Sequence, residues 1–242
     1  MVPVLKVLSL LLSYPTPETR GLMAEARELV TDERSLSTAD RRRLVALMDE
    51  LESGDLIDLQ ERYVGLFDRS RSLSLHLFEH IHGESRDRGQ AMIDLADLYA
   101  EHGLAVSARE LPDYLPLFLE FLSLLAPDEA RSLLGEPLHI ITALGQRLDR
   151  RDSLYAGTFK ALEAIAARTP DRADVAAVLA LADDDPDDQA ALDRAWEDQP
   201  VTFGGGVAGG VSPGGDCPAS REALARMDRP GPAAAVKEGI DG

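Results

Sequence analysis

Apolar residues recur at helical spacing along nearly all of the first 182 positions of this 242-residue chain. One such face, at positions i, i+3, i+4 and i+7, consists of Leu44, Leu47, Met48 and Leu51. Ser37 and Asp40 form a capping pair ahead of it. No run of alternating β-branched residues lies between turn signals, so we expect essentially no sheet. The pattern predicts an all-α fold, a single-domain bundle of about eight to ten helices.

Cap residues and prolines set the ends of several expected helices. Thr16 and Pro17, at the cap and first position, predict a helix that runs to about Val30. A short helix is expected from Leu73 to His82. A very apolar helix is expected to open at Pro112, and because apolar residues surround it almost fully, we expect it to be central.

The composition changes after residue 182, which marks the expected end of the helical domain. Residues 183–203 form an acidic linker that carries the island WEDQPVTF, from Trp196 to Phe203. This island is either a docking motif or a strap onto the domain, and its composition does not separate the two. Residues 204–242 are rich in glycine and proline, and we expect a flexible, disordered C-terminal tail.

The charge excludes several classes of partner. A net charge of -18 is a poor basis for binding nucleic acid or an anionic membrane surface. A basic or apolar peptide is a better match, because opposite charge steers encounter. No run of about 20 apolar residues exists, so no membrane insertion is expected. The single cysteine, Cys217, excludes an internal disulfide, and a reducing cytoplasm is the expected compartment.

Polar groups are densest between Tyr63 and Met92, where three histidines stand beside glutamates. His76, Glu79 and His80 spell H-x-x-E-H, in which two histidines at i, i+4 on one helix reach a single zinc ion. Such a site also needs a third ligand from a later helix, and no recognisable one is present. A receptor for a helical peptide needs an apolar cleft with a charged rim instead. The central stretch, the apolar helix and the negative charge supply those parts, so the sequence favours binding over catalysis.

The run FDRSRSLSLHLFEHIHGESRDRGQAM, Phe67 to Met92, closely resembles the signature of the NarJ family, the assembly chaperones of respiratory nitrate reductase. Leu10 to Pro15 resembles the opening of the family, Glu110 to Leu122 its later core helix, and WEDQPVTF a motif that follows the domain. The resemblance covers about residues 3–203 and does not extend to the glycine-rich tail.

The resemblance implies a helical chaperone without catalytic residues, metal or cofactor. Its expected partner is the N-terminal peptide of the nitrate reductase α subunit, within the apo α–β complex in the cytoplasm. It would support molybdenum cofactor insertion, delay membrane anchoring, and be absent from the finished enzyme. The resemblance also implies a peptide-binding set, made up of Asp68, Arg69, Leu75, Phe78, Glu79, His80, His82, Glu84, Arg86, Asp87, Arg88, Gln90 and Met92.

Two other functions stay open at this point. One is a metal-dependent hydrolase with a zinc site at the H-x-x-E-H motif. The other is a plain scaffold protein, for which the island from Trp196 to Phe203 would hold the partner.

Overall fold

The computed structural model describes residues 2–82, 86–107 and 110–181, and only the backbone of His82 and Arg86. The chain divides into a unit of residues 1–198 and a unit of residues 199–242, and every described residue lies in the first. The expected linker, its aromatic island and the expected tail therefore fall outside the described residues. The domain boundaries stay a prediction.

The described ranges contain twelve α-helices, one 3-10 turn and no strand, which confirms the all-α prediction. The elements are α1 (Pro3–Leu11), α2 (Pro17–Gly21), α3 (Met23–Asp32), α4 (Thr38–Ser53), α5 (Leu56–Phe67), η1 (Arg71–Leu73), α6 (Glu79–His82), α7 (Arg86–Glu101), α8 (Leu115–Leu124), α9 (Pro127–Leu134), α10 (Leu138–Arg150), α11 (Ala156–Ile165) and α12 (Arg172–Leu179).

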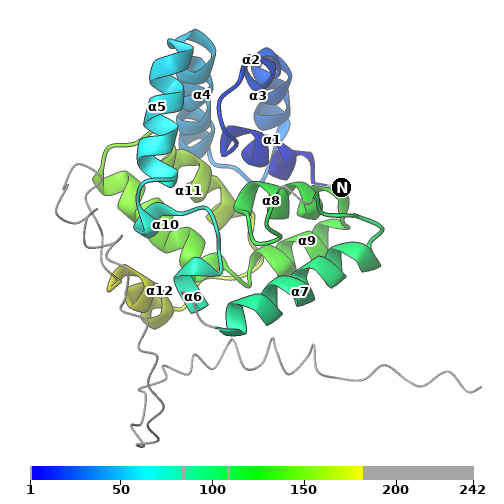
Figure 1. Ribbon diagram of the computed structural model, residues 1–242. Helices are drawn as coiled ribbons and strands as arrows, with labels where there is room; N and C mark the ends of the chain where they lie inside the picture. Colours follow the sequence, from blue (N-terminus) through cyan, green and yellow to red (C-terminus); the bar gives the residue numbers. More distant parts are fainter. Residues whose placement is uncertain (1, 83–85, 108–109, 182–242) are drawn as a thin grey trace, which may run out of the picture. The chain divides into compact units, whose positions relative to one another are not determined.

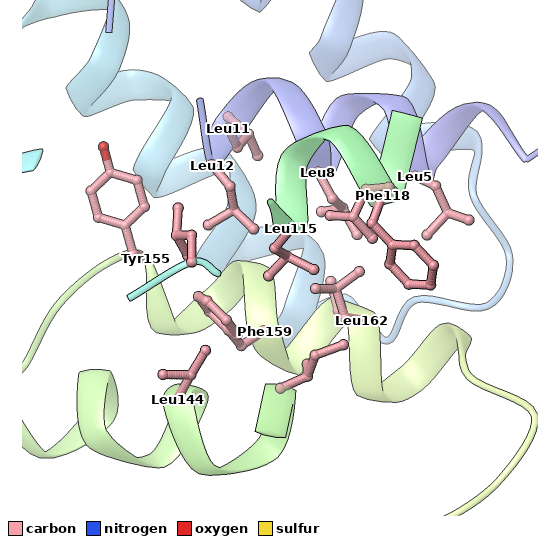
Figure 2. Close-up of a cluster of buried hydrophobic side chains, with 14 of the residues drawn as sticks. Leu5, Leu8, Leu11, Leu12, Leu115, Phe118, Leu144, Tyr155, Phe159 and Leu162 are labelled. Carbon is pink, nitrogen blue, oxygen red and sulfur yellow. The ribbon is translucent and has the colours of Figure 1, made fainter. Parts of the chain in front are cut away.

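The core forms where α1, α8, α10 and α11 meet. Helix α1 packs on α8, while α11 packs on α10, α4 and α1 (Figure 1). Figure 2 shows the side chains that fill this contact, with Leu8 of α1, Leu115 of α8 and Phe159 of α11 directed toward one another. All three are 0% exposed. The expected central place of the apolar helix is confirmed, because seven residues of α8 are buried.

Two hydrogen bonds fix α1 to α8 alongside the apolar contact. The backbone N–H of Val2 donates to the carbonyl of Ser123 over 3.0 Å. The hydroxyl of Ser9, 8% exposed, donates to the carbonyl of Pro116 over 2.6 Å. These bonds satisfy polar groups that burial would otherwise leave without partners. The orientation of the first helix on the central one is therefore set by direction as well as by apolar area.

Helices α10 and α11 approach closely at a glycine. A Cβ added at Gly145 would lie 2.9 Å from the Cβ of Phe159. Real side chains do not approach so closely, so any larger residue here would push the two helices apart. The absence of a side chain at position 145 thus lets the backbone of α10 lie against the buried Phe159.

The helix expected from Pro17 to Val30 is wrong as a single element. It is divided at Leu22, which ends α2 and precedes α3. Gly21 just before the division lowers helix stability locally. The turn lets Met23, Ala26 and Val30 face the core from α3.

No helix within the described ranges combines the length and the apolar character needed to cross a membrane. This result agrees with the absence of a long apolar run in the sequence. It bears on the described helices alone.

Candidate functional site

The segment from Ser74 to Phe78 is not helical. A bridge at His76 pairs it with the start of α8, and Leu77 and Phe78 form a turn. The N–H of Leu77 donates to the carbonyl of Asp113 over 3.0 Å, and the N–H of Leu115 donates to the carbonyl of Leu75 over 2.8 Å. The pairing is antiparallel and centres on a bridge between His76 and Tyr114. It joins two parts of the chain that lie nearly 40 residues apart in sequence.

The helix predicted from Leu73 to His82 is therefore wrong. The segment holds the turn η1, then a bridge at His76 and a turn at Leu77 and Phe78, and only Glu79–His82 is α-helical. The reason is visible in the sequence, where Leu73, Leu75 and Leu77 alternate with polar residues at the period of a strand. All three leucines are buried, with exposures of 0%, 2% and 3%.

The same pairing delays the start of α8. A helix from Pro112 was expected, but α8 begins at Leu115 with Tyr114 as its N-cap. The backbone groups of Asp113 and Leu115 are engaged by the segment across from them. Pro112 and Asp113 consequently lie in a turn and Tyr114 is extended, so the helix starts only at Leu115.

Asp113 lies at the centre of this arrangement, and its side chain is 0% exposed. One carboxylate oxygen lies 3.1 Å from Nδ1 of His76, and the other accepts the backbone N–H of Phe78 over 3.1 Å. Nη2 of Arg88 lies 3.8 Å from the second oxygen. A buried carboxylate is stable only with such partners, so Asp113 holds the paired segment and α7 together.

Arg88 and Glu79 form the accessible part of the cluster. Their side chains are 21% and 28% exposed, and Nη2 of Arg88 lies 3.2 Å from Oε1 of Glu79. Arg88 comes from α7 and Glu79 from the first position of α6. A charged pair that is partly open to solvent thus lies directly on the buried carboxylate of Asp113.

His80 supports the same segment from the inside. Its ring is 8% exposed, and Nε2 lies 2.8 Å from the carbonyl of Ser74. Because a carbonyl can only accept, Nε2 carries the proton. Burial lowers the pKa of His80 below its usual value, and the nearby charge of Arg147 lowers it further, while the bond to Ser74 opposes both. The ring is therefore neutral near pH 7.

Arg147 of α10 is a buried cation behind this segment, at 1% exposure. Its guanidinium donates to the carbonyl of Ser72 over 2.7 Å and to the carbonyls of Val178 and Leu181 over 2.9 Å each. The first carbonyl belongs to η1 and the other two to the end of α12 and the residues after it. Arg147 thus links the base of the site to the last helix.

Tyrosines connect the site to α1. The ring of Tyr114 lies 5.4 Å from that of His76, and its hydroxyl lies 3.0 Å from that of Tyr63. The Tyr63 hydroxyl also donates to the carbonyl of Leu12 over 2.8 Å. Burial raises the pKa of Asp68, and the neighbouring His76 opposes that shift. Asp68, at the end of α5, therefore lies within electrostatic range of the cluster.

Comparison with known proteins identifies the family. A family model described as "Nitrate reductase delta subunit" matches residues 33–161. The protein named "Nitrate reductase molybdenum cofactor assembly chaperone NarJ" from Escherichia coli (strain K12) is 42% identical over 201 residues, which is 82% of this chain and 84% of that protein. The chain belongs to the NarJ family. The resemblance stated from the sequence is confirmed.

Two further NarJ-family relatives have lower identity. "Probable nitrate reductase molybdenum cofactor assembly chaperone NarW" from Escherichia coli (strain K12) is 40% identical over 200 residues, 83% of each chain. A protein with the same description but named NarJ, from Bacillus subtilis (strain 168), is 33% identical over 149 residues, 62% of this chain and 80% of that one. The matched region includes the whole cluster around Asp113.

The structure separates the described residues among those expected to bind a peptide into three groups. Glu79, Arg88 and the half-buried Phe78 meet around Asp113, whereas Leu75 and His80 are buried beneath them. The remaining described members lie at the surface or partly buried, just after α5 or on α7, and these are Asp68, Arg69, Asp87, Gln90 and Met92. Glu84 and the side chains of His82 and Arg86 lie outside the described residues. Nothing tests the set as a binding surface, so it stays a prediction.

Asp113 and Arg147 were not predicted as site residues from the sequence. A signal for Arg147 exists, because it shares the apolar face of α10 with Leu144 and Leu148. For Asp113 the only signal was the alternation at Leu73, Leu75 and Leu77, which indicates an extended segment in need of a partner.

The zinc interpretation loses its geometric basis. His76 lies ahead of α6 and its ring faces Asp113, while Nε2 of His80 faces a carbonyl, so the two rings do not share a helix face. Within the described ranges, no group of three or more His, Cys, Asp or Glu side chains is placed to hold a metal ion.

Proposed function

We propose that this protein is a chaperone of nitrate reductase assembly that binds the N-terminal segment of the apo α subunit in the cytoplasm. In this proposal it supports insertion of the molybdenum cofactor and delays membrane anchoring of the apo α–β complex until maturation is complete. It is absent from the finished enzyme, catalyses no reaction and holds no cofactor of its own.

The observation that carries the proposal is the partly exposed Glu79–Arg88 pair on a buried support, within the region shared with the NarJ family. Asp113 fixes the backbone of Phe78 and the ring of His76 directly beneath this pair. Charged groups whose positions are set before a partner arrives lose little conformational freedom on binding. A rigid, charged surface of this kind suits recognition of a peptide.

The chemistry of the surroundings fits a peptide with both apolar and basic residues. Phe78 and Met92 are half-buried and offer apolar contact beside the charges. Ile81 and Ile93, on α6 and α7, are 40% and 55% exposed. The net charge of -18 favours the approach of a basic segment. An amphipathic helix with basic residues has both properties.

Calorimetric titration with a peptide that copies the first ~20 residues of the cognate α subunit tests the proposal. We expect saturable one-to-one binding with Kd of about 1 μM or tighter. A wild-type protein that takes up no heat from this peptide contradicts the proposal. A purified protein that contains one zinc ion per chain would instead revive the hydrolase interpretation.

Site-directed variants locate the binding surface. Glu79→Ala should weaken binding by about tenfold or more, equivalent to about 1.4 kcal/mol. Asp97→Ala is the matched control, because it removes the same charge from an exposed position on α7. Equal affinity of the two variants would place the binding surface elsewhere in the protein.

A further inference from the structure

Arg88 lies between two carboxylates of different exposure. Its Nη2 is 3.2 Å from Oε1 of Glu79 but 3.8 Å from Oδ2 of Asp113. Glu79 is 28% exposed, whereas Asp113 is completely buried. The guanidinium thus bonds to the carboxylate that solvent reaches and stays beyond hydrogen-bond distance of the one that solvent does not reach.

The guanidinium is incompletely bonded in this position. Nε of Arg88 is buried and has no hydrogen-bond partner in the part of the chain that the structure describes. A guanidinium offers five N–H donors in a planar fork that fits a carboxylate with two parallel bonds. A buried donor without a partner is unfavourable. Arg88 is therefore held by Glu79 in an arrangement that leaves part of its bonding capacity unused.

Asp113 has capacity for a closer contact with Arg88. Its carboxylate accepts the N–H of Phe78 and lies against the ring of His76. An ionised carboxylate offers about four lone-pair sites, so further donors can be accepted. A shift of Arg88 away from Glu79 and onto Asp113 would supply them. That shift leaves the partly exposed carboxylate of Glu79 open to another cation.

The charge of the cluster indicates what would take that place. Glu79 and Asp113 bring two carboxylates to the cluster, and Arg88 brings one guanidinium. One further cation would balance the cluster. The ammonium of a lysine or the guanidinium of an arginine has this charge and reaches the exposed side of Glu79.

We propose that Arg88 is an internal competitor, which occupies Glu79 in the free protein and is displaced by a basic side chain of the client. The displaced guanidinium then closes onto Asp113. This inference rests on the proposed function and names the chemistry that the site selects. It also reverses the expected role of Arg88, which opposes client binding instead of contacting the client.

The test compares wild-type protein with Arg88→Gln in calorimetric titrations with the α-subunit peptide. Arg88→Gln leaves Glu79 without its internal cation, so we expect the peptide to bind about three- to tenfold more tightly. Arg42→Gln is the matched control, because it changes the net charge equally from an exposed position on α4. The control should alter affinity by less than about twofold.

A second peptide, with its basic residues replaced by glutamine, keeps the test decisive where Arg88→Gln does not fold. Wild-type protein should lose affinity for this neutral peptide, and Glu79→Gln should bind the basic and neutral peptides within about twofold of each other. Full sensitivity to the peptide charge in Glu79→Gln overturns the inference.

The outcomes separate the inference from the proposed function. Weaker binding of the basic peptide by Arg88→Gln means that Arg88 contacts the client, which overturns the inference and leaves the chaperone function intact. Failure of the wild-type protein to bind either peptide refutes both.

Discussion

Removal of the Asp113 carboxylate should destabilise the protein more than any substitution on the exposed surface. The side chain is 0% exposed, and it accepts the N–H of Phe78 and lies 3.1 Å from the ring of His76. Asp113→Ala leaves the Phe78 amide without its partner and Arg88 without its nearest buried counter-charge. Loss of one member of a buried charged pair costs about 3–5 kcal/mol.

Asp113→Asn should cost less, about 1–3 kcal/mol. The amide oxygen of asparagine still accepts the N–H of Phe78, so the losses are the charge opposite Arg88 and the oxygen that faces His76. For a domain of this size, each kcal/mol lowers Tm by about 2–4 °C, so the alanine variant should melt about 6–20 °C below the wild type.

Urea unfolding at pH 7 measures the free energy of unfolding directly, and the slope m should stay unchanged if the unfolded ensemble is the same. Asp97→Ala, at an exposed position on α7, is the control and should stay within about 0.5 kcal/mol of the wild type. An Asp113→Ala protein as stable as this control refutes the view that the carboxylate holds the site together.

Three further substitutions test other parts of the structure by the same unfolding assay. Burial lowers the pKa of His80 below 6.5, so the stability that its neutral form contributes is full above about pH 6.5 and is lost as the pH falls toward the folded-state pKa. His80→Gln should therefore make the free energy of unfolding fall less steeply with decreasing pH. An unchanged pH dependence would contradict this expectation. Gly145→Ala should cost about 1–3 kcal/mol because its Cβ collides with α11, whereas Gly65→Ala, with nothing within 4 Å, should be neutral or stabilising by up to about 1 kcal/mol. Arg147→Met should cost at least about 2 kcal/mol and expose the amides of α12 to hydrogen exchange, while the exposed Arg150→Met should do neither.

The helices could be predicted because their signals are local. The N-cap Ser37 accepts the N–H of Asp40, as the capping pair indicated, and Leu44, Leu47, Met48 and Leu51 are all buried on one face of α4. Both features depend on residues within two turns of one another. Sequence spacing is sufficient to identify such elements.

The segment at His76 could not be placed in the same way. Its partner, Asp113, lies 37 residues further along the chain, and neighbouring residues do not indicate that its carboxylate will be buried. The Pro112–Asp113 pair is typical of a helix start, which led to the wrong start for α8. Tertiary pairing overrode the local preference here.

Several residues of the stretch predicted to hold the site do come together around Asp113, but the sequence did not distinguish their structural roles. Glu79 and His80 are adjacent in sequence, yet one is partly open to solvent and the other is 8% exposed. Depth of burial depends on which elements cover the segment. In this protein, that cover comes from α7, α8 and α10.

The contacts of Arg147 determine how late in synthesis this part of the protein can finish folding. The same guanidinium holds Ser72, near the base of the site, and the carbonyls of Val178 and Leu181. A ribosome adds those last two residues more than 100 positions after Ser72. A nascent chain therefore cannot complete the buried contacts of Arg147 with Ser72, Val178 and Leu181 until almost all of the described residues have emerged. A partly synthesised chain would thus lack the contacts that hold the base of the candidate site.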